Sequence, residues 1–137
     1  MAALAHGLGH ALGAVFRVPH GRAVALFLPY TIEYCANLPE SGNRYEELAH
    51  FLGFAAVNEK EAAFVLAAKI RDLERQINQP LCLADLGIEK TALDNEIEQL
   101  IENALNDTQT IMSTRIPDEN DLRLLFQYAY DGKNIDF

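Results

Sequence analysis

The feature that most constrains the fold is a series of amphipathic segments whose apolar residues recur three and four positions apart. The clearest is NEKEAAFVLAAKIRDLERQI, 58–77, where Asn58 suits an N-cap and Glu61 follows three residues later. No segment shows the alternating pattern that is typical of a strand. The pattern therefore predicts an all-α fold. The inward face of 58–77 is expected to comprise Phe64, Ala67, Ile70, Leu73 and Ile77.

Further helices are expected on the same grounds, with a loop over 38–44 and a connector over 79–87. Pro29 is expected to bend or interrupt the second helix because proline cannot donate a backbone hydrogen bond. In the last helix, Asp118 is placed as the cap, with Asp121 three residues beyond it. The expected ranges are 2–16, 21–36, 45–54 (stopped by Gly53), 89–105 and, after Asp118, a helix to about Tyr130 before Gly132. Within 89–105, the inward residues should be Leu93, Ile97, Leu100, Ile101 and Leu105.

Length and charge bound the class of protein. The chain has 137 residues, half of them apolar, which suits one domain over 1–137. Acidic residues outnumber basic ones by 20 to 11, and the basic ones are scattered, so nucleic acid and anionic membranes are poor partners. No apolar run is long enough to span a bilayer, and the N-terminal stretch lacks the basic region of a signal peptide.

The two cysteines give little indication of a metal or disulfide framework. Cys35 and Cys82 lie far apart, with no CxxC spacing. We expect both to be small buried apolar side chains in a reducing, cytoplasmic setting.

Three of the four histidines fall within fifteen residues, in ALAHGLGHALGAVFRVPHGRA, 3–23. His6 and His10 are four apart, so on a helix they share a face and are spaced to chelate an ion. His20 follows Pro19, whose fixed φ would hold the turn stiffly. The alternative is a set of histidines bonded to the backbone or exposed at a helix end. The spacing alone leaves both open, because the Glu of an HExxH motif is missing.

These residues also match a known family. The run His6, His10, Leu12-Gly13, Pro19-His20-Gly21 and Leu28-Pro29 resembles the C-terminal half of iron-containing alcohol dehydrogenases. The later segments RYEELAHFLG, INQPLCLADLGI, LNDTQT and RIPDENDLRLLFQYAYDG are similar to that family too, so the resemblance covers essentially the whole chain. It implies a helical bundle like the C-terminal domain of the dehydroquinate synthase-like fold.

The resemblance also implies a function. In that family the helical domain faces an N-terminal domain that binds NAD or NADP, and one Asp and three His hold Fe(II) or Zn(II) in the cleft between them. By this resemblance His6 and His20 are metal ligands. His10 is the non-ligand histidine beside the nicotinamide, which handles a proton or orients the cofactor, so it does not chelate together with His6. Gly7, Gly9 and Gly13 are expected to let the helix approach the cofactor and partner domain, or simply to allow tight packing.

Residues upstream of His6 in the family, including the other two ligands, are not in this sequence. We therefore expect the isolated chain to be inactive and to homo-oligomerise or to have a frayed first helix, because the apolar face of 2–16 would be open to water. No other carboxylate is expected to replace the missing Asp, and Asp107 is expected to end a helix. His50 should lie at the surface or the core edge. Asp85, Asp107, Asp118 and Asp121 are all placed on surface caps or connectors.

Two other interpretations stay open. The first is a non-catalytic helical interaction or dimerisation module built on the same scaffold. The second is a small independent metalloenzyme, which would need a third protein ligand.

Overall fold

The computed structural model describes residues 3–38 and 44–137, and every regular element in them is helical. The all-α prediction is therefore confirmed, and each expected helix is present to within a few residues. The elements are α1 (Ala3–Phe16), α2 (His20–Ala36), α3 (Tyr45–Phe51), α4 (Glu59–Gln76), η1 (Ala84–Leu86), α5 (Lys90–Leu105), η2 (Thr110–Met112) and α6 (Glu119–Asp131).

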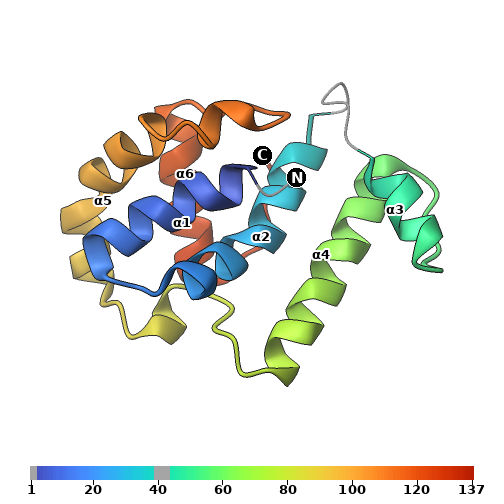
Figure 1. Cartoon of the computed structure of the whole chain (residues 1–137), viewed down its shortest axis with the longest axis horizontal. Coiled ribbons are helices and arrows are strands. Elements are labelled where there is room, and N and C mark those ends of the chain that lie inside the picture. The colour runs from blue at the N-terminus through green and yellow to red at the C-terminus, as the bar shows by residue number, and fades with distance from the viewer. Residues whose placement is uncertain (1–2, 39–43) are drawn as a thin grey trace.

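Helix α1 occupies the middle of the bundle, beside α2 and α5 and against η2 (Figure 1). The α3–α4 pair joins the bundle through α4, which packs along α2 at the right of the view. Among residues 3–38 and 44–137, no helix is long and apolar enough to cross a membrane.

The leucines of α1 form the centre of the core. Leu4, Leu8 and Leu12 are fully buried, because α2, α5 and η2 surround this helix. Our expectation that the apolar face of 2–16 would be open to water is therefore wrong for the residues described. Burial of these side chains contributes roughly 1.5–3 kcal/mol each relative to exposure.

Several local signals are confirmed. The side chain of Asn58 accepts the Glu61 N–H at 2.9 Å, and that of Asp118 accepts the Asp121 N–H at 2.8 Å. Gly53 has a φ of 79°, the left-handed conformation that suits the end of α3. Pro29, by contrast, does not interrupt α2, which runs unbroken from His20 to Ala36. Its missing N–H costs one helical hydrogen bond, which the surrounding burial of this helix offsets.

Two inward faces differ from expectation. Helix α4 buries three alanines and a leucine, Ala62, Ala63, Leu66 and Ala67, whereas Leu73 and Ile77 are 56% and 65% exposed. The alanines let α4 approach its neighbours closely. Hydrophobicity alone does not predict whether the alanine-rich face or the face with Leu73 and Ile77 packs against them. On α5, Leu105 is 36% exposed and Ala104 is buried instead.

A buried ionic cluster ties α2, α4 and the C-terminal segment together. Glu33 is fully buried and accepts hydrogen bonds from both terminal guanidinium nitrogens of Arg71 and from the Ile135 N–H at 2.9 Å. Arg71 also lies over the ring of Tyr30.

Glu74, one helical turn beyond Arg71, is 4% exposed, and neither carboxylate oxygen has a hydrogen-bond partner in the described residues. Burial raises the pKa of Glu74 to about 7, although Arg71 opposes this.

Two glycines of α1 allow close contacts within this domain. A Cβ on Gly9 would lie 2.8 Å from Val24 Cγ2 and 3.0 Å from the Val24 nitrogen of α2. A Cβ on Gly7 would lie 2.1 Å from Thr110 Oγ1. These two glycines thus serve tight packing, and the expectation that they face a cofactor or partner domain is wrong. Gly13 is less crowded, because a Cβ on it would lie 3.2 Å from the Val18 carbonyl oxygen.

The first prediction concerns the contact between α1 and α2. Gly9→Ala should destabilise the chain by about 1–3 kcal/mol, because the Val24 backbone cannot give way as a flexible side chain would. Urea unfolding followed by circular dichroism measures this. Gly21→Ala is the matched control, since a Cβ there meets nothing within 4 Å, and it should leave stability unchanged or higher. Equal stability of the two variants would contradict this account.

The second prediction concerns Glu74. Its pKa is raised in the folded chain, so between about pH 4.5 and pH 7 the folded state binds more protons than the unfolded state, and stability falls as the pH rises. Glu74→Gln removes the charge and should stabilise the chain by up to about 3 kcal/mol above pH 7, with little gain below pH 4.5. Thermal unfolding across this range tests it, with exposed Glu96→Gln as control. A gain independent of pH would show that Glu74 does not titrate in this way.

Candidate functional site

Three imidazoles gather at one edge of the bundle. His6 and His10 come from α1, and His20 is the first residue of α2. The ring centroids are 5.8 Å apart for His6 and His10, 5.4 Å for His6 and His20, and 5.1 Å for His10 and His20. His6 is half-buried, while His10 and His20 are exposed. The structure therefore brings the three predicted histidines into one accessible cluster.

The geometry of α1 explains why this edge carries histidines. Successive residues of a helix turn by about 100°, so Gly7 and Gly9 lie on opposite sides of the His6–His10 edge. The Gly9 side meets α2 and the Gly7 side meets Thr110 of η2. The histidine edge thus lies between these two contacts, where His6 is half-buried and His10 is exposed.

His20 is placed by the same packing. Pro19 precedes α2 with φ −55° and ψ 135°, and its carbonyl accepts the first helical bond, from the Ala23 N–H at 3.0 Å. His20 lies one turn before Val24, the residue that touches Gly9. The close approach of α1 and α2 at Gly9 therefore brings His20 to the rings of α1.

Asp107 belongs to this cluster, and sequence reasoning missed it. Its Oδ2 atom lies 2.7 Å from Nδ1 of His10, and its Oδ1 accepts the Gln109 N–H at 2.7 Å. Burial raises the pKa of Asp107, but the Gln109 N–H and the neighbouring His10 and His6 together hold it below its ordinary value. Asp107 does follow the end of α5, as expected, but the expectation did not include its contact with His10. No local pattern links two residues 97 positions apart, so the sequence held no signal for this contact.

The donor chemistry of the cluster suits a transition metal in part. Two imidazoles on one tetrahedral ion place their centroids about 5 Å apart, which is close to both the 5.4 Å between His6 and His20 and the 5.1 Å between His10 and His20. Within residues 3–38 and 44–137, no group of three His, Cys, Asp or Glu side chains is arranged to hold an ion. The described chain therefore offers a pair of imidazole donors and not a complete coordination shell.

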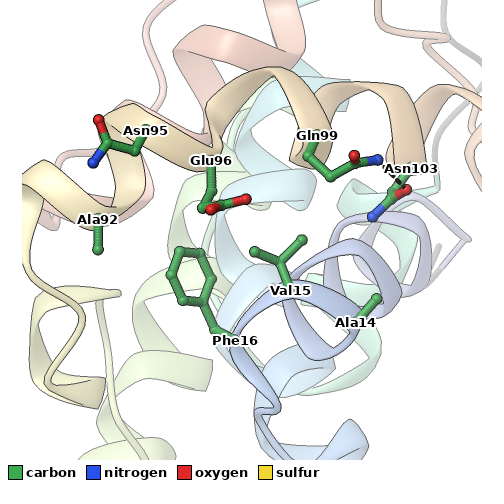
Figure 2. A pocket seen from close by; sticks show the side chains of 8 residues that line it. All are labelled: Ala14, Val15, Phe16, Ala92, Asn95, Glu96, Gln99 and Asn103. Carbon is green, nitrogen blue, oxygen red and sulfur yellow. Dashed lines mark hydrogen bonds between the residues drawn. The ribbon is translucent and has the colours of Figure 1, made fainter.

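A groove of about 480 Å³ lies between α1 and α5 (Figure 2). Phe16 and Val15 face Glu96 across it. Ala14 lies one turn beyond His10 on α1, so the groove begins next to the cluster, although no histidine lines it. The remaining lining residues are Ala92, Asn95, Gln99 and Asn103.

The other predicted carboxylates lie away from the cluster. Asp85 and Asp118 accept backbone N–H groups locally, as expected of caps and connectors. Asp121 differs, because it is partly buried and accepts a hydrogen bond from the Tyr34 hydroxyl at 2.6 Å. The expectation that it is merely a surface cap is therefore wrong.

The fourth histidine and the cysteines also lie elsewhere. His50 is exposed, as expected, and its Nε2 lies 3.0 Å from the Ala56 carbonyl. Cys35 is buried, with its sulfur 3.4 Å from Ser113 Oγ, and Cys82 is half-buried. Neither forms a disulfide.

Comparisons with known proteins agree on one family. The chain is 29% identical over 134 residues to an NADPH-dependent butanol dehydrogenase of Clostridium saccharobutylicum, covering 98% of this chain and 34% of that protein. It is 30% identical over 129 residues to a lactaldehyde reductase of Escherichia coli, covering 93% and 32%. The solved alcohol dehydrogenase of Oenococcus oeni superposes with a TM-score of 0.78 at 29% identity, covering 92% and 32%.

The chain thus spans about a third of the length of these relatives. Its residues 1–130 match the family model described as Fe-containing alcohol dehydrogenase family, C-terminal. The histidine-bearing bundle and the matched sequence lead to the same conclusion: this chain belongs to the Fe-containing alcohol dehydrogenase family and corresponds to its C-terminal region.

Proposed function

We propose that this chain supplies the metal-binding helical half of an iron-type alcohol dehydrogenase linked to NAD or NADP. The observation that carries the proposal is the pairing of the His6 and His20 rings, 5.4 Å apart, on an accessible edge beside His10. Imidazole is a ligand common to Fe(II) and Zn(II). His6 and His20 are the two residues of this chain that would hold the ion.

The remaining ligands would come from the N-terminal nucleotide-binding domain. Two imidazoles alone bind a divalent ion weakly, because affinity depends on a complete and supported set of donors. The exposure of His10 and His20 supports a partner domain that covers this edge. We expect the isolated chain to be inactive for this reason, and the assembled enzyme to be a cytoplasmic homo-oligomer.

When bound, the divalent ion would supply Lewis-acid stabilisation of the substrate oxygen, and the nicotinamide would supply the hydride acceptor. His10 would take the hydroxyl proton in alcohol oxidation, so that loss of this proton and of the hydride leaves the carbonyl product. In the reverse direction the same ring would return the proton. An imidazole suits this role because it exchanges protons near neutral pH.

The named activities of the relatives suggest the substrate class. The butanol dehydrogenase and the lactaldehyde reductase are named for small aliphatic substrates. We therefore expect a small alcohol or its aldehyde as substrate.

The third prediction is that activity needs an N-terminal nucleotide-binding domain. The chain should show no NAD(P)-linked alcohol oxidation alone, and activity should appear on co-expression with an N-terminal domain from a family relative. His20→Ala should lower that activity at least about 100-fold and release the metal, since a ligand is lost. His50→Ala is the matched control, because His50 is exposed and bonds only the Ala56 carbonyl among the described contacts. If the chain forms a stable complex with a co-expressed N-terminal domain but no such combination is active, the non-catalytic interaction module would be supported instead.

The fourth prediction concerns the metal affinity of the chain by itself. Calorimetric titration with Zn(II) should give a dissociation constant weaker than about 1 μM, because two donors leave most of the coordination shell to water. His6→Ala should weaken binding further, and His50→Ala should not. Nanomolar binding would contradict the proposal and support an independent metalloenzyme.

A further inference from the structure

Asp107 is a carboxylate that contacts the histidine cluster directly. Its Oδ2 atom lies 2.7 Å from His10 Nδ1, and its side chain is 17% exposed while that of His10 is 42% exposed. The residue comes from the turn after α5, whereas His10 lies in the middle of α1. A contact between such distant segments requires the turn to be held firmly.

Two features hold this turn against α1. The Thr110 N–H donates to the Asp107 carbonyl at 3.0 Å, and the Gln109 N–H donates to Asp107 Oδ1 at 2.7 Å. Thr110 is in turn buried against Gly7, where no side chain intervenes. Gly7 and His10 are three residues apart on α1, so anchoring Thr110 at Gly7 sets Asp107 beside His10.

We propose that Asp107 is a positioning residue for His10. Its carboxylate accepts a hydrogen bond from the Nδ1–H group, fixes the ring, and leaves Nε2 as the unprotonated nitrogen of the neutral imidazole. A carboxylate has no proton to donate, so at this distance Nδ1 must carry the hydrogen. The low pKa of Asp107 supports an ionised partner at neutral pH.

The consequence for catalysis rests on the proposed function of His10, whereas the tautomer does not. With Nδ1 occupied, only Nε2 can accept a proton from a substrate hydroxyl. An Nε2–H tautomer would present a donor where alcohol oxidation needs an acceptor. Asp107 thus prepares His10 as a base before any substrate binds.

Asp107→Asn is a sharp test, because asparagine keeps the shape but has one carbonyl oxygen. The Gln109 N–H claims that oxygen, which leaves the amide NH2 facing His10 Nδ1. An amide donor requires Nδ1 to be unprotonated, so the variant should switch His10 to the Nε2–H tautomer. Asp118→Asn is the matched control, since Asp118 also accepts a backbone N–H but belongs to the start of α6.

Long-range proton–nitrogen correlation spectra of the full chain, with a chelator present, report the tautomer. They should be recorded at about pH 8.5, where an ordinary imidazole is neutral. We expect Nδ1 to be the protonated nitrogen of His10 in the parent chain and in Asp118→Asn, and Nε2 in Asp107→Asn. A parent chain in which Nε2 is protonated, or a tautomer unchanged by Asp107→Asn, would overturn the proposal.

This readout needs neither metal, cofactor nor N-terminal domain, so its failure is distinct from failure of the proposed dehydrogenase activity. The parent spectrum tests the proposal even if a variant folds poorly. In an active reconstituted enzyme, Asp107→Asn should also lower kcat by about 10- to 100-fold with little change in KM. An unchanged kcat would show that Asp107 does not position the catalytic ring.

Discussion

The site depends on how closely α1 approaches its neighbours through two glycines. At Gly9 the backbone of α2 comes within reach, and at Gly7 the Thr110 side chain fills the place of a Cβ. The first contact brings His20 to the histidine edge, and the second brings Asp107 there. Both contacts belong to the domain's own core packing.

The buried ion pair that stabilises the fold lies apart from the histidine edge. The fully buried Glu33 with Arg71 joins α2, α4 and the C-terminal segment, away from the histidines. Such a pair holds elements in register, because breaking it would strand a buried charge. Glu74 beside it has no hydrogen-bond partner in the described residues and is held towards its neutral form by burial. The histidine edge, by contrast, is open, as a surface must be if a second domain is to complete it.

Local signals predicted much of this architecture. The caps at Asn58 and Asp118 and the αL glycine after α3 depend on residues within a few positions of each other, so the sequence displays them. The inward face of α4 was predicted less well, since two apolar stripes compete on that helix. Which one is buried depends on the neighbours, and the small alanines allowed the closer approach. Asp107 could not have been assigned from its surroundings, because a helix-ending carboxylate looks the same whether or not a histidine lies opposite.

The sequence by itself determined the all-helical class, the approximate helix bounds and the three histidines whose spacing resembles that of a dehydrogenase family. These follow from periodicity, capping and motif, which are properties of neighbouring residues. Only the tertiary structure decided that Gly7 and Gly9 serve packing and that Asp107 meets His10. Those outcomes depend on contacts between segments far apart in the chain, and such contacts exist only once the helices have packed.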